Sequence, residues 1–180
     1  RKIIHLATGI EIAFLPLFVD YSVIQFLAVG LLMVVLLSYR FRIFKAIHSV
    51  KRVTIGEVLY PIGVGVCAFI EPMPWVFAAA VLHLAIADSA AALAGFKWGT
   101  PTRYFILTHG KSFLGSLAFF YTSMAIFAGA LYFVDSAPLP DPFVLLVAYP
   151  AILTLLENLS LLGTDDITIP VAVVLLLSNI

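Results

Sequence analysis

Seven apolar stretches fill most of this 180-residue chain and leave only short polar connections between them. An α-helix needs about 20 predominantly apolar residues to cross about 30 Å of hydrocarbon. Hydrophobic residues make up 63% of the sequence, whereas soluble domains contain about 45–50%. A soluble fold of this length has too little interior to bury so many apolar side chains. The sequence therefore predicts an all-α, polytopic integral membrane helix bundle, with one transmembrane domain over residues 1–180.

The positions of the basic residues support a count of about seven transmembrane helices. The predicted spans are Ile3–Val19, Ser22–Ser38, Ile55–Ile70, Pro74–Gly95, Phe113–Val134, Pro142–Glu157 and Ile167–Ile180. Lys and Arg near span ends concentrate on the cytoplasmic side. All ten Lys and Arg residues precede the first span or lie in the connections after the second and fourth spans. The connections on the other side contain Asp20, Glu71, Asp135 and Asp141. We therefore expect a cytoplasmic N-terminus.

Other features narrow the function classes. The formal net charge is zero and no basic tail is present, so we expect no nucleic-acid partner. The single cysteine, Cys67, excludes a disulfide framework and a Cys-based zinc site within the chain. The connection Tyr39–Thr54 mixes basic and apolar residues at helical spacing. This pattern predicts an interfacial helix on anionic lipid head groups, and the alternative is a basic wall beside a phosphorylated substrate.

Several ionisable residues fall within or at the ends of the predicted spans. Such residues cost about 2.5–3.5 kcal/mol each on insertion scales and mark functional sites or buried pairs. They are His5, Glu11, Glu57, His83, Asp88, Glu157, Asp165 and Asp166. Most lie toward the cytoplasmic ends of their spans, which predicts one polar cleft open to the cytoplasm. His83 lies about 140° around an ideal helix from Asp88, so we expect it to pack or to pair with Glu11.

Three segments contain groups suited to phosphate chemistry. Asp88 precedes a run of small residues that ends at Gly95, and this smooth helix face leaves room for a metal ion and a phosphate. The alternative is a buried Asp bonded to a neighbouring helix. Lys111 and Ser112 precede the fifth span, where free backbone N–H groups favour phosphate. Here the alternative is that Ser112 acts as an ordinary N-cap.

The third segment brackets a short cytoplasmic connection with Glu157, Asp165 and Asp166. Carboxylate oxygens suit Mg²⁺, which usually binds one or two carboxylates together with substrate phosphates. Capping of the last span is the alternative, but two adjacent acids exceed what a cap requires. The three segments together predict Mg²⁺-assisted phosphoryl transfer, with a nucleotide arriving from the cytoplasm and a lipid entering sideways.

The chain also resembles a known family through five motifs in order. These are RKIIH, GEVLYPIGV, ADSAAALAGFKWG, KSFLGS and ENLSLLGTDDITIP. They are similar to motifs of the polyprenol kinase family, which includes dolichol kinases, phytol kinases and the CTP-dependent diacylglycerol kinases of fungi. That family is related to the phosphatidate cytidylyltransferases. The resemblance covers nearly the whole chain and implies transfer of a phosphoryl group, typically from CTP, to a lipid hydroxyl.

By matching position, the resemblance also implies roles for individual residues. Metal ligands would be Asp88, Glu157 and Asp165. Catalytic residues would be Asp88, His5 and Lys111, with His5 as a base or as a charge stabiliser. Nucleotide contacts would come from Lys2, Gly95, Lys97, Gly99, Lys111, Ser112, Gly115 and Ser116. One departure is Asp166, which stands where the family more often has Asn and adds a negative charge.

Three functions remain open from the sequence. The first is a lipid-alcohol kinase that uses Mg²⁺ and CTP, or another nucleoside triphosphate, on a polyprenol, dolichol or phytol. The second is a cytidylyltransferase that makes a CDP-lipid. The third is a small proton-coupled transporter with Glu11, His83 and Asp88 as a relay. The small-residue faces permit helix association, so a homo-oligomer is also compatible with the sequence.

Overall fold

The computed structural model describes residues 2–41, 56–106, 109–133 and 140–178, without the side chains of residues 2–5, 109, 133 and 178. The α-helices are α1 (Lys2–Ala13), α2 (Tyr21–Phe41), α4 (Gly56–Ile70), α5 (Pro74–Leu82), α6 (Asp88–Trp98), α7 (Phe113–Phe133), α8 (Tyr149–Leu159) and α9 (Asp165–Ser178). A short antiparallel hairpin joins β1 (Arg103–Ile106) to β2 (His109–Ser112). The all-α prediction is confirmed, with this hairpin as an addition. Most of the connection Tyr39–Thr54 lies outside the described residues.

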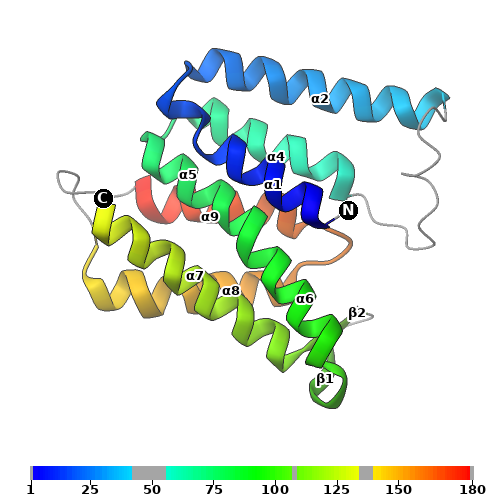
Figure 1. Cartoon of the computed structure of the whole chain (residues 1–180), viewed down its shortest axis with the longest axis vertical. Helices are drawn as coiled ribbons and strands as arrows, with labels where there is room; N and C mark the ends of the chain where they lie inside the picture. The colour runs from blue at the N-terminus through cyan, green and yellow to red at the C-terminus, as the bar shows by residue number, and fades with distance from the viewer. Residues whose placement is uncertain (1, 42–55, 107–108, 134–139, 179–180) are drawn as a thin grey trace.

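The helices run back and forth between two ends of the bundle, and the chain starts and finishes at opposite ends (Figure 1). The end where the chain starts contains Arg40, Lys97 and Lys111, and we call it the basic end. The other end contains Asp20 and Glu71, and we call it the acidic end. The helices thus alternate in direction as the sequence predicts, because the described basic residues either precede the first predicted span, as Lys2 does, or follow an even-numbered one.

A single long helix crosses the middle of the bundle. It consists of α5 and α6, joined by a π-helical turn over His83–Ala87 in which the Asp88 N–H donates to the His83 carbonyl. A π-turn inserts one residue and shifts the helix register. The expected 140° between His83 and Asp88 assumed an uninterrupted α-helix, an assumption that this turn breaks.

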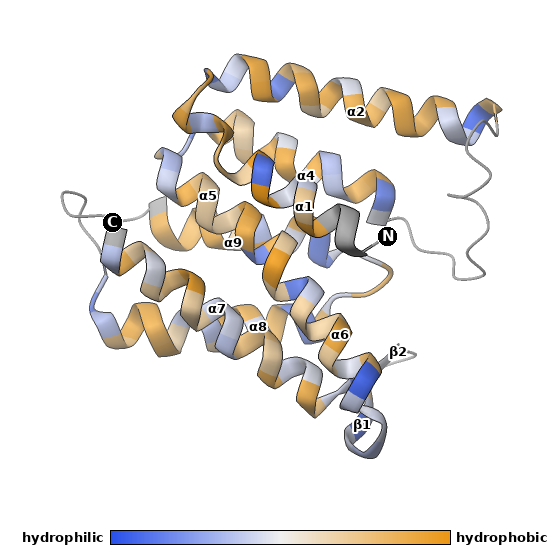
Figure 2. Cartoon of the chain, viewed as in Figure 1, coloured by the Kyte–Doolittle hydropathy of each residue, from blue (hydrophilic) through white to orange (hydrophobic). Residues whose placement is uncertain are grey.

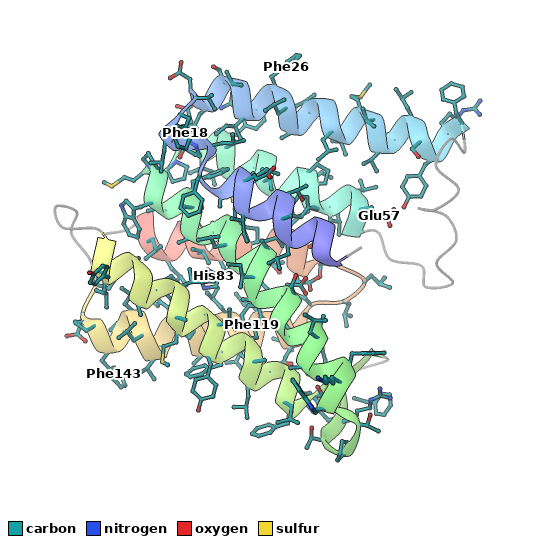
Figure 3. The ribbon with its side chains drawn as sticks, in the orientation of Figure 1. Phe18, Phe26, Glu57, His83, Phe119 and Phe143 are labelled. Atoms are coloured by element: carbon teal, nitrogen blue, oxygen red, sulfur yellow. The ribbon has the colours of Figure 1, made fainter. Side chains whose placement is uncertain are left out.

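His83 is a packing residue inside the bundle (Figure 3). Its Nδ1 lies 2.7 Å from the Ala79 carbonyl oxygen, and its Nε2 lies 2.8 Å from Ser123 Oγ on α7. The expected packing role is confirmed. The alternative pairing with Glu11 is wrong, because both ring nitrogens have other partners and Glu11 is exposed.

Apolar side chains cover the outside of the bundle and identify the chain as a membrane protein. Phe26 on α2 is 76% exposed and points outward (Figure 3), and α2 is apolar along most of its length (Figure 2). Among the described residues, three helices have the length and apolarity to cross a membrane, namely Tyr21–Phe41, Pro74–Trp98 and Phe113–Tyr132. Shorter apolar helices cover Leu6–Leu17, Gly56–Ile70 and Val144–Leu159. The count of seven spans and the cytoplasmic N-terminus stay predictions.

Candidate active site

Glycines let the end of α6 touch the start of α7 at the basic end. Ser112 caps α7, since its Oγ accepts the Gly115 N–H at 3.1 Å. A Cβ on Gly95 or on Gly115 would lie 2.9 Å from Ser112 Oγ, and one on Gly99 would lie 2.6 Å from Ser112 Cβ. The structure thus brings together four predicted nucleotide-binding residues. The capping alternative for Ser112 is confirmed, and the three glycines allow close backbone packing.

The hairpin that follows α6 was not expected from the sequence, which suggested only a linker. In β1, Tyr104 and Ile106 are partly buried while Arg103 and Phe105 are exposed. This alternation is the period of a strand with one covered face, and it is the signal that could have revealed the hairpin. The register pairs Tyr104 with Lys111. The hairpin therefore presents these two residues as direct cross-strand neighbours.

Lys111 and Glu157 form a partly buried ion pair. Lys111 Nζ donates to Glu157 Oε1 at 2.6 Å and to the Glu157 carbonyl oxygen at 2.8 Å. Glu157 is only 7% exposed, and it lies in the last turn of α8, where the helix dipole also favours a cation. Burying either charge alone would cost several kcal/mol, and the attraction between the two side chains offsets this desolvation cost.

A second set of hydrogen bonds lies beside this ion pair. The Tyr104 hydroxyl donates to Asn158 Oδ1 at 2.6 Å and lies 2.7 Å from Ser116 Oγ. Ser116 Oγ also donates to the same Asn158 oxygen, at 2.9 Å. Because Tyr104 pairs with Lys111 and Asn158 follows Glu157, the hairpin contacts the end of α8 at two adjacent points. Sequence reasoning missed Tyr104 and Asn158; the position of Asn158 next to Glu157 was the available signal.

The remaining predicted metal ligands act electrostatically on Glu157. The negative charges of Asp88 and Asp165 both act on the Glu157 carboxylate. Asp165 comes close to Glu157 because the chain reverses between α8 and α9, with left-handed backbone at Leu162 (φ 56°) and Gly163 (φ 97°). The Glu157 carboxylate is therefore under the influence of two other negative charges as well as the Lys111 ammonium group.

Asp166 lies beside Asp165 in the sequence but faces another helix. A Cβ on Gly56, the first residue of α4, would lie 2.6 Å from Asp166 Oδ2. The charge of Asp166 also acts on Tyr60, in the second turn of α4. A carboxylate near a helix N-terminus is electrostatically favourable. The two adjacent acids at the start of α9 thus have different neighbours.

The cluster has the donor chemistry for Mg²⁺ but does not form a complete metal cage. Across the described residues, no three His, Cys, Asp or Glu side chains converge closely enough to hold a metal ion by themselves. Mg²⁺ usually binds one or two carboxylates and completes its shell with waters and substrate phosphates. Asp88, Glu157 and Asp165 supply oxygen ligands of this kind around a single lysine, so they fit a cation that arrives with a nucleotide.

Three predicted site residues either lie elsewhere or have side chains that the structure does not describe. Lys97 is exposed, and its Nζ lies 4.7 Å from the centre of the Trp98 ring. The side chains of Lys2 and His5 lie outside the described part of the structure, although the backbone of α1 starts at the basic end. The roles implied for these three residues stay predictions.

Comparisons with known proteins agree with the motifs. No protein-family profile matches the chain, and no solved structure matches it. The sequence is similar to that of a phytol kinase from Synechocystis sp., with 29% identity over 180 aligned residues that cover 94% of this chain and 74% of the relative. The similarity therefore covers nearly the whole chain. It agrees with the resemblance to the polyprenol kinase family that the five motifs indicate.

Proposed function

We propose that this chain is a kinase that transfers a phosphoryl group from CTP, or from another nucleoside triphosphate, to the hydroxyl of a membrane lipid alcohol such as phytol, dolichol or another polyprenol. The observation that carries the proposal is the buried Lys111–Glu157 pair, with the charges of Asp88 and Asp165 acting on it. Phosphoryl transfer depends mainly on positioning and on neutralising phosphate charge. The ammonium group of Lys111 can neutralise phosphate directly, and the carboxylates can hold a metal cation that does so. The similarity to a phytol kinase supports the lipid-alcohol acceptor.

The nucleotide phosphates would bind between Lys111 and the N-terminus of α7. In the structure Lys111 is bonded to Glu157, so an incoming phosphate would compete with that carboxylate for the ammonium group. The glycine junction at Gly95 and Gly115 keeps bulky side chains away from the first turn of α7. The N-terminal backbone amides of a helix favour phosphate through their partial positive charge.

Asp88, Glu157 and Asp165 would hold Mg²⁺ when the nucleotide is bound. The ion would neutralise charge on the transferred phosphoryl group. Once Lys111 moves to a phosphate, the three carboxylates lose their cationic neighbour and gain affinity for the metal. Tyr104 and Asn158 are positioning residues, because they hold the hairpin that carries Lys111. His5 is proposed as the base that accepts the proton of the lipid hydroxyl, as the resemblance implies.

The membrane setting decides how the two substrates arrive. The basic end would face the cytoplasm, because Lys and Arg near span ends concentrate there. The nucleotide would then enter from the cytoplasm, while the lipid alcohol would reach the same end by diffusing within the membrane.

The transporter alternative loses support from His83. A proton relay would need this residue to face Glu11 or Asp88, but its ring nitrogens contact Ala79 and Ser123. The cytidylyltransferase alternative is separated from the kinase by its products, since it releases pyrophosphate and leaves a CDP-lipid.

The deciding experiment is a product assay on the purified full chain in detergent. The assay contains Mg²⁺, CTP labelled at the γ-phosphate, and either phytol, a short polyprenol, dolichol or diacylglycerol. We expect label in a lipid product, and we expect Glu157→Gln and Asp88→Asn to remove most of it. Asp20→Asn, an exposed acid at the acidic end, is the matched control and should retain activity. Pyrophosphate release with a phospholipid added, without labelled lipid, would replace the kinase by the cytidylyltransferase.

A further inference from the structure

The end of α6 and the hairpin that follows it form one corner of the basic end (Figure 1), and they carry exposed aromatic and basic side chains. Its aromatic members are strongly exposed: Phe96 by 85%, Trp98 by 57% and Phe105 by 75%. Its basic members, Lys97 and Arg103, are exposed as well. We call these five residues the aromatic–basic corner. Aromatic residues at the ends of membrane helices lie at head-group level, which is where this corner would be.

The charge of the corner is one-sided. Lys97 Nζ sits over the Trp98 ring, a cation–π contact that keeps the ammonium group at the aromatic surface. Arg103 extends the positive charge onto β1. The sequence contains no Asp or Glu between Asp88 and Asp135, so no acid in this stretch compensates Lys97 and Arg103.

The hairpin has two different faces. Tyr104 is partly buried and bonded to Asn158, whereas Arg103 and Phe105 on either side of it are exposed. Alternate side chains of a strand point to opposite faces. The face with Tyr104 therefore packs against the bundle, and the face with Arg103 and Phe105 is exposed. An aromatic side chain beside a guanidinium group suits the boundary between acyl chains and phosphates.

We propose that the aromatic–basic corner docks into the head-group layer and prefers anionic phospholipids there. The aromatic rings would insert at the acyl boundary, and Lys97 and Arg103 would contact lipid phosphates. Each basic residue near a membrane surface is worth about 1 kcal/mol on anionic lipid, or about fivefold in local lipid preference at most. This inference does not depend on the kinase activity, and its test measures no catalysis.

The two tryptophans of the chain give the experiment its internal comparison. Trp98 belongs to the corner, whereas Trp75 is the second residue of the same long helix, at the acidic end. Trp75→Phe leaves Trp98 as the reporter, and Trp98→Phe leaves Trp75. Each variant is reconstituted in mixed vesicles of phosphatidylglycerol and phosphatidylcholine, with bromine on one lipid or on the other near the head-group end of its acyl chains. The measurement is the ratio of fluorescence quenching by the brominated anionic lipid to quenching by the brominated zwitterionic lipid.

We expect a ratio of about two to five for Trp98 and about one for Trp75. Adding Lys97→Gln and Arg103→Gln to the Trp98 reporter should lower its ratio toward one. Arg40→Gln is the matched control, because Arg40 also lies over an aromatic ring at the basic end, that of Phe41 at 5.9 Å, yet belongs to α2. It should leave the Trp98 ratio unchanged.

High salt tests the same point without any change to Lys97 or Arg103. Raising the ionic strength to about 0.5 M shortens the screening length to a few ångströms, so the Trp98 ratio should fall toward one. A ratio of one for Trp98 at low salt, or a high ratio that survives both the double substitution and salt, would overturn the proposal. Absence of quenching by either brominated lipid would also overturn it, because Trp98 would then not be at the head-group layer.

Discussion

At the basic end of the bundle Lys111 and Glu157 pair in a partly buried position, whereas at the acidic end Gln25 and Glu71 share an exposed hydrogen bond of 3.1 Å. Another acid at that end, Asp141, accepts the Phe143 N–H at 2.9 Å and so forms a local turn at the surface. Both ends thus use carboxylates as hydrogen-bond acceptors. Burial distinguishes them: among the acids that the structure describes at the two ends, Glu157 at the basic end is kept away from solvent and is influenced by further charges. The burial of a carboxylate therefore identifies a candidate site better than the mere presence of an acidic residue does.

Neutralising single carboxylates should have the largest effect on activity. Of the two adjacent acids at the start of α9, only the one near Glu157 should be sensitive. Asp165→Asn should lower kcat for lipid phosphorylation by at least about 100-fold, because it removes an oxygen ligand and a charge next to Glu157. Asp166→Asn should stay within about threefold, because that side chain faces the start of α4. The check is the kinase assay with both variants at saturating CTP. Equal losses for both would mean that the whole start of α9, rather than one side chain, belongs to the site.

The helices could be predicted from the sequence because their signals are local. The predicted span Ile55–Ile70 matches α4 (Gly56–Ile70). The match is close because the length of an apolar run sets the length of the helix that can be buried in the membrane. The sorting of Lys and Arg into alternate connections also predicted which helix ends lie together. For that reason the sequence alone places Lys111 and Glu157, 46 residues apart, at one end of the bundle.

The contacts inside the site could not be predicted, because they depend on how distant segments pack. Lys111 was expected on phosphate and Glu157 on metal, and no periodicity reveals that they bind each other in the structure. The bond from Tyr104 to Asn158 exists only because the hairpin folds back onto α8. The π-turn at His83–Ala87 could not be predicted either, because the periodicity of apolar residues does not show where one extra residue is inserted in a helix.

Separating the ion pair should have the next largest effect, this time on stability. Lys111→Met leaves the Glu157 carboxylate buried beside two other negative charges, so we expect a loss of about 3 kcal/mol. The double variant Lys111→Met with Glu157→Met should recover most of that loss, because no charge remains unpaired, while staying inactive. At the acidic end Glu71→Gln should change stability by less than about 0.5 kcal/mol. The measurement is unfolding in mixed micelles titrated with sodium dodecyl sulfate.

A double variant that is no more stable than Lys111→Met would contradict this account. The pair would then contribute by shape and packing rather than by mutual neutralisation. In that case the contrast between the ends would concern packing density and not charge.

Two glycines of α7 sharpen the comparison within a single helix. Gly115→Ala at the basic end would place a Cβ 3.1 Å from the Ala91 carbonyl oxygen, which is too close without backbone movement, so we expect about 2 kcal/mol of destabilisation. Gly129→Ala meets nothing within 4 Å in the described structure and should be neutral or stabilise the helix by up to about 1 kcal/mol. The same unfolding titration compares them. A neutral Gly115→Ala would show that α6 and α7 can separate, and that the glycine junction is looser than the contacts indicate.

The smallest effect should come from one hydroxyl of the hairpin. Tyr104→Phe keeps the ring but removes the donor to Asn158, so we expect a loss of about 1 kcal/mol in stability and a KM for the nucleotide several-fold higher, with kcat changed less. The reason is that Lys111 stays beside Glu157 but on a hairpin that is held at one point instead of two. Tyr121→Phe, at a 58% exposed position of the same bundle, should change neither quantity. If kcat fell while KM stayed constant, Tyr104 would be acting on the reacting atoms themselves, and the hairpin would be part of the chemistry rather than a support for it.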